Sequence, residues 1–159
     1  MTGFHLAQFN LARLKAPIDA PETADFVANL DRINALAESH PGFVWRLKGE
    51  GFDSTSQPIK SDPLLIPNLS VWESPQALGA FVYRSDHMPI LRRRREWFEH
   101  MEVYMALWWI PAGSRPTFDD GFAKLDTLAR LGPSPEAFTF RDAFPAPTMS
   151  APDSALEQC

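Results

Sequence analysis

Apolar residues recur at every second position in four stretches of the chain, which is the period of a β-strand. These stretches are Phe4 to Leu14, Gly42 to Lys48, Asn68 to Trp72 and Val103 to Ile110. Because the strands are largely apolar on both faces, we expect both sides of the sheet that they form to be covered.

Polar residues interrupt one face of the first and third strands. Gln8 and Asn10 share a face in the first strand, and Asn68, Ser70 and Trp72 share a face in the third. Strands of this kind otherwise favour Val or Ile, and a polar group buried there without a partner costs about 1 to 3 kcal/mol. Asn10, Asn68 and Ser70 therefore either satisfy each other across neighbouring strands or point into a ligand pocket, where amide donors can hold a carbonyl or enolate oxygen.

The second strand and the stretch after it differ in pattern. Alternation predicts Phe43, Trp45 and Leu47 on the inward face of the strand. Residues 49–63 then carry glycine, serine, aspartate and proline with no period, which predicts a long loop that is either a functional lid or disordered.

Three amphipathic segments predict helices. Apolar residues at steps of three and four indicate a helix from Glu22 to Glu38, and a second helix begins with Ser74 as its N-cap and Pro75 at its first position. Pro89 forbids a straight continuation, so we expect a break near His87. A third helix follows Thr117, and residues 137–141 predict a short final strand.

The order strand, helix, strand, strand, helix, strand predicts an α+β fold with a ferredoxin-like antiparallel sheet and helices on one face. In that topology the first and third strands are central neighbours, which brings Asn10 near Asn68 or Ser70. The other face is apolar as well, and a second copy of the chain is the simplest cover for it, so we expect a homodimer. One domain spans residues 1–142, and the proline-rich residues 143–159 predict a disordered tail.

Composition narrows the classes of partner. The 159 residues carry a net charge of -5 and a pI of about 5.3, which disfavours nucleic acid and anionic membranes. The sequence has no apolar run that could span a bilayer and no signal-peptide pattern, so we expect a cytoplasmic protein without a membrane partner. The single cysteine, Cys159, allows no internal disulfide or cysteine metal cluster.

His87 and the tryptophans are the remaining candidates for chemistry. His87 can act as a general base or metal ligand, or simply cap a helix. No HxH or HExxH spacing joins it to another histidine, so a zinc or non-haem iron site is not expected. Tryptophans are mostly core or interface residues, and one or two of them could line a pocket for an aromatic ligand.

The chain resembles the dimeric α/β-barrel superfamily, which includes antibiotic-biosynthesis (quinol) monooxygenases and haem-degrading monooxygenases. The resemblance rests on Pro41-Gly42-Phe43 before the second strand, on Asn68 four residues before Trp72, and on His87 in the following helix. The segments LAQFNLARL, NLSVWES, YRSDH with RRRREWF, and LWWIPAG are similar to an uncharacterised family of that superfamily. The superfamily implies a homodimer with an apolar pocket between sheet and helices in each protomer.

Two assignments of the site follow from this resemblance. The quinol monooxygenases imply Asn68, Trp72 and Tyr83 around a substrate. The haem-degrading enzymes imply Asn10 and Trp72 around a haem, with His87 as its axial ligand.

We therefore predict a cofactor-independent monooxygenase that binds a hydrophobic, aromatic small molecule, with haem as the alternative cofactor. The predicted catalytic residues are His87, Asn68, Trp72 and Tyr83, and the predicted substrate-binding residues are Asn10, Ser70, Trp45 and Trp97. An isomerase or lyase would use the same parts, and a non-enzymatic binding protein would need the same aromatic pocket.

Overall fold

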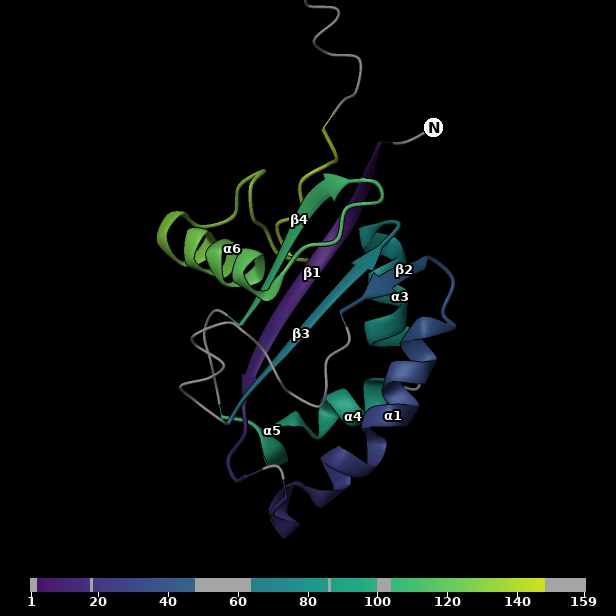
Figure 1. Cartoon of the computed structure of the whole chain (residues 1–159), viewed down its shortest axis with the longest axis vertical. Coiled ribbons are helices and arrows are strands. Elements are labelled where there is room, and N and C mark those ends of the chain that lie inside the picture. The colour runs from purple at the N-terminus through teal and green to yellow at the C-terminus, as the bar shows by residue number, and fades with distance from the viewer. Residues whose placement is uncertain (1–2, 18, 48–63, 86, 100–103, 148–159) are drawn as a thin grey trace, which may run out of the picture.

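A four-stranded antiparallel sheet forms the centre of the protein (Figure 1). The computed structural model describes residues 3–17, 19–47, 64–85, 87–99 and 104–147, so the predicted loop at 49–63 lies outside the described residues. The strands are β1 (Phe4–Arg13), β2 (Phe43–Arg46), β3 (Leu65–Trp72) and β4 (Met105–Pro111). Their spatial order is β2-β3-β1-β4, which is the ferredoxin-like arrangement predicted from the order of elements.

The helices occupy the connections between the strands and the segment after the last one. They are the 3-10 turn η1 (Pro21–Thr23), α1 (Ala24–Glu38), α3 (Pro75–Arg84), α4 (His87–Arg92), α5 (Arg94–Trp97) and α6 (Phe118–Leu131). The helix expected over residues 22–38 is thus confirmed as η1 followed by α1.

The register of the two central strands confirms the predicted faces. Asn10 pairs with Asn68, Gln8 pairs with Ser70, and Leu6 pairs with Trp72. All of these residues lie on the face that packs against α1 and α3, which we call the helix face. The polar residues of the two strands therefore meet on one side of the sheet.

Helices cover both faces of the sheet. Trp72 and Leu6 pack with Leu78 of α3 and Ala37 of α1 on the helix face. α6 lies on the opposite side, where its buried residues join Ala7, Phe9 and Leu69 (Figure 1). The two connecting helices thus share one face as predicted, but the face that we expected a second chain to cover is covered in part by α6.

The predicted faces of the second strand are wrong for Phe43. The pairing of β2 with β3 shifts register between Phe43 and Trp45, as in a β-bulge. Phe43 consequently packs on the helix face, whereas Trp45 and Leu47 pack on the α6 face. An extra residue in a bulge reverses the alternation that a regular strand would keep.

Local capping explains where the helices begin. The Ser74 hydroxyl accepts a hydrogen bond from the backbone N–H of Ala77, 3.1 Å away. Thr117 and Asp120 form a reciprocal capping box at the start of α6. The break expected near His87 falls at Ser85, whose hydroxyl accepts from the backbone N–H of His87 at 3.0 Å.

The segment after α6 returns to the sheet along the outer side of β4. Instead of the predicted strand over residues 137–141, it makes an isolated bridge in which Phe138 and Leu107 exchange both backbone hydrogen bonds at 2.8 Å. Further on, the Trp109 indole N–H donates to the carbonyl of Phe144 at 2.9 Å. Disorder of the tail stays a prediction, since residues 148–159 lie outside the described part of the chain.

Candidate functional site

Among the described residues, the helix layer leaves the middle of the sheet uncovered at Asn68. β3 is a central strand, with β2 on one side and β1 on the other. Asn68 is nevertheless exposed, and its register partner Asn10 is half-buried. Among the described residues, the two amides therefore lie at an accessible part of the helix face, which we call the opening.

A chain of hydrogen bonds runs from this opening into the core. The Trp72 indole N–H donates to the Ser70 hydroxyl at 2.9 Å, and that hydroxyl donates to the Gln8 amide oxygen at 2.8 Å. The Gln8 amide nitrogen then donates to Asn10 Oδ1 at 2.6 Å. We call these four side chains the polar relay.

Burial makes the relay's internal bonds necessary. Trp72 is 1% exposed, and Gln8 and Ser70 are each 6% exposed. Removing one member would leave its neighbour buried and unsatisfied, which costs about 1 to 3 kcal/mol per group. The structure thus shows Ser70 hydrogen-bonded to other polar side chains of the sheet, which is one of the two expectations for these residues. Asn10 and Asn68 instead reach the opening.

Aromatic rings surround the inner end of the relay. Phe81 of α3 stacks on Trp72 with 5.4 Å between ring centroids, and Phe43 meets Trp72 edge to face, also at 5.4 Å. His40 lies against both Trp72 and Phe81, at 6.1 and 5.7 Å. The relay therefore ends in an apolar, aromatic environment.

His87 also packs against Phe81. Its ring centroid is 4.9 Å from that of Phe81, and its Nδ1 is 3.2 Å from the carbonyl oxygen of Val82. A carbonyl only accepts, so Nδ1 carries the hydrogen and Nε2 keeps a free lone pair in the neutral ring. Burial lowers the pKa of His87 below its ordinary value, so the ring is neutral at neutral pH.

Three other predicted site residues lie elsewhere. Tyr83 is 51% exposed and contacts Phe140, and partial burial raises the pKa of its phenol. Trp97 is buried beyond α4, where Arg93 lies 4.7 Å above its ring. Trp45 faces the α6 side, with Arg115 at 5.6 Å from its ring. The structure brings Asn10, Asn68, Ser70 and Trp72 together, places His87 next to Phe81, and leaves these three apart.

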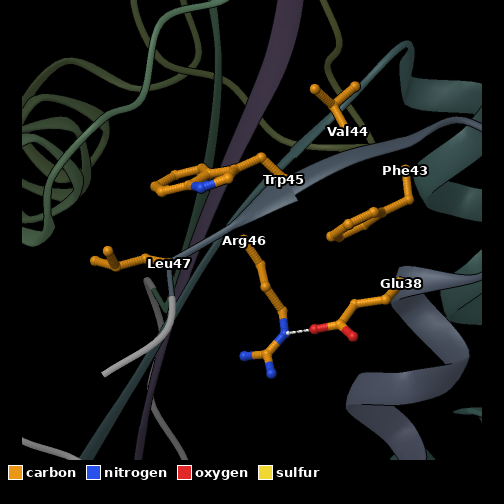
Figure 2. A pocket seen from close by; sticks show the side chains of 6 residues that line it. All are labelled: Glu38, Phe43, Val44, Trp45, Arg46 and Leu47. Carbon is orange, nitrogen blue, oxygen red and sulfur yellow. Dashed lines mark hydrogen bonds and ion pairs between the residues drawn. The ribbon is translucent and has the colours of Figure 1, made fainter. Parts of the chain in front are cut away.

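A hollow of about 540 Å³ lies along the edge strand β2. It is lined by Glu38 and residues 43–47, and Figure 2 shows Trp45 directed away from Phe43 and Arg46. The Arg46 guanidinium forms an ion pair with Glu38 at 2.7 Å. A second hollow, of about 330 Å³, lies between β4 and α6 beside Trp108 and Arg115. Both hollows are separate from the opening at Asn10 and Asn68.

Two residues of the site were not predicted as such from the sequence. Gln8 joins the two halves of the relay, and Phe81 connects Trp72 to His87. Gln8 carried the same signal as Asn10, a polar side chain on an apolar strand face. Phe81 carried no signal beyond that of an ordinary helix-core residue.

The donor set gives no metal site. Within the described ranges, no group of three His, Cys, Asp or Glu residues could hold a metal ion. His87 offers one nitrogen to a haem iron, but Phe81 packs against that ring and Trp72 is fully enclosed, so the described residues leave no room for a haem beside both. Among the same residues, no helix is both long and apolar enough to cross a bilayer.

The sheet order, the connecting helices and this polar opening define an α+β protein of the ferredoxin-like class, with a candidate ligand site on the helix face. The sequence model of one family, described as a domain of unknown function (DUF3291), matches residues 5–154. The chain belongs to that family, in agreement with the resemblance to an uncharacterised family. A comparison with curated proteins finds no match.

Several solved structures are similar at low identity. SnoaB from Streptomyces nogalater, described as a cofactor-independent oxygenase, is 15% identical with a TM-score of 0.45, covering 72% of this chain and 97% of SnoaB. PA3566 from Pseudomonas aeruginosa is 13% identical with a TM-score of 0.48, covering 72% of this chain and 98% of its own. MupZ from Pseudomonas fluorescens is 10% identical with a TM-score of 0.45, covering 95% of this chain and 94% of its own.

Proposed function

We propose that this protein binds a hydrophobic, aromatic small molecule at the opening and oxidises it with molecular oxygen without a cofactor. The observation that carries the proposal is the pair of accessible amides, Asn10 and Asn68, that face each other on the two central strands of the sheet. Amides at that position stabilise a bound carbonyl or an anionic oxygen. The aromatic surroundings of Trp72 favour a ring-shaped ligand.

The reaction that suits these parts begins with loss of a proton from a phenol, enol or anthrone. The resulting anion is electron-rich and transfers one electron to O2, and the two radicals combine at carbon to give a peroxide. Loss of water from the peroxide leaves a quinone, so anthrone and O2 give anthraquinone and water. The protein supplies a base, amide donors for the anionic oxygen and an environment that excludes water.

His87 is the proposed base. Its Nε2 can accept a proton because Nδ1 is held by the carbonyl of Val82 and the ring is neutral. Trp72 and Phe81 are buried, so a substrate held by the amides reaches His87 only if these rings move aside when it binds.

Oxygen uptake with anthrone and with a panel of quinols tests the proposal. We expect uptake equal to the product formed, a strong loss of rate in His87→Ala and Asn68→Ala, and no change in Asn29→Ala. Asn29 is a matched control because, among the described residues, its amide forms hydrogen bonds within α1, to Asp25 and Arg32. Turnover without oxygen consumption would replace the proposal with an isomerase or lyase, and an anthrone that binds but stays unchanged in air would replace it with a binding protein.

We also infer that the protein is a homodimer. β2 keeps Val44 exposed at 37%, and the neighbouring Trp45 and Leu47, which pack on the α6 face, are only half-buried. A second copy laid over this region would bury them, as expected for an apolar sheet face.

A further inference from the structure

We infer that the polar relay fixes the orientation of the Asn10 amide so that its N–H groups, rather than its oxygen, face the opening. Gln8 and Ser70 are then positioning residues, and the ligand group that the opening accepts is an oxygen acceptor such as a phenolate, enolate or carbonyl. The ligand class rests on the proposed function, whereas the orientation of Asn10 does not.

The relay starts at a group that can only donate. The indole nitrogen of Trp72 has one hydrogen and no acceptor capacity, so its 2.9 Å contact obliges the Ser70 oxygen to accept. The remaining hydrogen on Ser70 must therefore find its own acceptor. Ser70 is 6% exposed, and among the described residues the atom in reach is the Gln8 amide oxygen at 2.8 Å.

This bond fixes Gln8. With its oxygen toward Ser70, the nitrogen of the same amide is directed toward Asn10, at 2.6 Å from Oδ1. The reversed amide would direct two donors, from Gln8 and Trp72, at the Ser70 oxygen. The Ser70 hydrogen would then be buried without an acceptor, which native structures avoid.

The same logic passes to Asn10. Its Oδ1 is occupied by the Gln8 donor, so its Nδ2 lies on the other side of the amide, away from Gln8. Within the described part of the chain Nδ2 has no protein partner. Asn10 is half-buried and its register partner Asn68 is exposed, so these two hydrogens are available at the opening. An anionic or carbonyl oxygen is the group that satisfies them.

The orientation can be measured without any ligand. In the full-length protein, nuclear Overhauser effects from the Gln8 side-chain amide hydrogens should reach the β-hydrogens of Asn10 and not the indole N–H hydrogen of Trp72. The reversed pattern, in which they reach the indole hydrogen, would overturn the inference. In Ser70→Ala, where Gln8 has lost the donor that orients it, we expect contacts of both kinds.

The ligand class is measured with 4-nitrophenol, whose visible absorbance distinguishes phenolate from phenol. The readout is the ratio of the two affinities, obtained by titration above and below the pKa of the free probe. The wild-type protein should prefer phenolate. Gln8→Met, which keeps the shape of the side chain but has no donor and only a weak thioether acceptor, should reduce that preference by about tenfold or more, as for loss of an oriented hydrogen bond to a charged oxygen. Ser70→Ala should change the ratio in the same direction by less.

Gln76→Met is the matched control, since Gln76 is exposed on α3 and lies outside the relay. A merely structural role for Gln8 would lower stability and both affinities together but would leave their ratio unchanged, and that result would overturn the inference. If 4-nitrophenol does not bind while the Overhauser pattern is as expected, the phenolate ligand and the proposed function fail and the orientation of Asn10 stands. If the pattern is reversed while phenolate binds, the relay fails and the proposed function stands.

Discussion

Two glycine-to-alanine substitutions should change stability in opposite directions. Gly79 lies in α3 and Gly121 in α6, and both would gain the same methyl group. At Gly79 the new carbon would meet only a ring carbon of Phe140, at 3.9 Å. At Gly121 it would fall 2.4, 2.5 and 2.8 Å from three ring atoms of Phe9. The added methyl group therefore makes an ordinary van der Waals contact at Gly79 but overlaps severely with the ring of Phe9 at Gly121.

The magnitudes follow from these distances. Alanine in place of a helical glycine stabilises by about 0.5 to 1 kcal/mol, and we expect that gain for Gly79→Ala. Phe9 is 0% exposed and has no free space to move into. Overpacking of a core typically costs about 1 to 3 kcal/mol, so after subtraction of the helix-propensity gain Gly121→Ala should be destabilised by up to about 2.5 kcal/mol.

Urea unfolding at one fixed protein concentration measures both variants. Tryptophan fluorescence and far-ultraviolet circular dichroism should give the same midpoint, which should rise for Gly79→Ala and fall for Gly121→Ala. Each kcal/mol corresponds to about 2 to 4 °C in Tm for a chain of this size. A Gly121→Ala protein at least as stable as Gly79→Ala would show that α6 does not pack on Phe9 as described.

Three further predictions address the oligomer, His87 and haem. Light scattering should give about twice the 17.9 kDa of one chain, and a stable monomer at micromolar concentration would contradict the dimer. Burial lowers the pKa of His87 below 6.5, so as the pH falls below that value the unfolded chain binds a proton more readily than the folded chain does. The contribution of His87 to the free energy of unfolding is therefore complete above about pH 6.5 and decreases as pH falls below it. His87→Gln should flatten that decrease in urea midpoints, and an unchanged slope would contradict the assignment. Hemin should leave the spectra of the wild type and His87→Ala unchanged, whereas a Soret band lost in His87→Ala would establish haem ligation.

The faces of the central strands could be predicted because a period of two is a local property. Gln8 and Asn10 lie on one face of β1, and Asn68 and Ser70 lie on one face of β3. Antiparallel pairing of the two strands is then enough to bring the four side chains together. The helix starts at Ser74 and Thr117 could be predicted for the same reason, because each cap is a local contact between one side chain and one backbone N–H.

The parts that could not be predicted depend on partners distant in sequence. The pattern of α6 indicates one apolar side but not which sheet face this side covers. The sequence alone therefore suggests a second chain as the cover for the sheet face that α6 in fact covers in part. The bulge in β2 appears only in its pairing with β3. Tyr83 differs, because it lies two residues after Phe81 and about 200° around the helix, so its separation from Trp72 follows from helix geometry alone.

The segment that follows α6 determines how far the chain can be shortened. Ala137 belongs to the cluster under α6, while Phe138, the next residue, is fully buried among residues of the helix face. This segment therefore passes around the outer side of β4 and fills a space on each side of the sheet. Cutting the chain after Leu131 would keep every named helix and strand and still uncover Leu107 and Trp109, so such a fragment should aggregate although its secondary structure is complete.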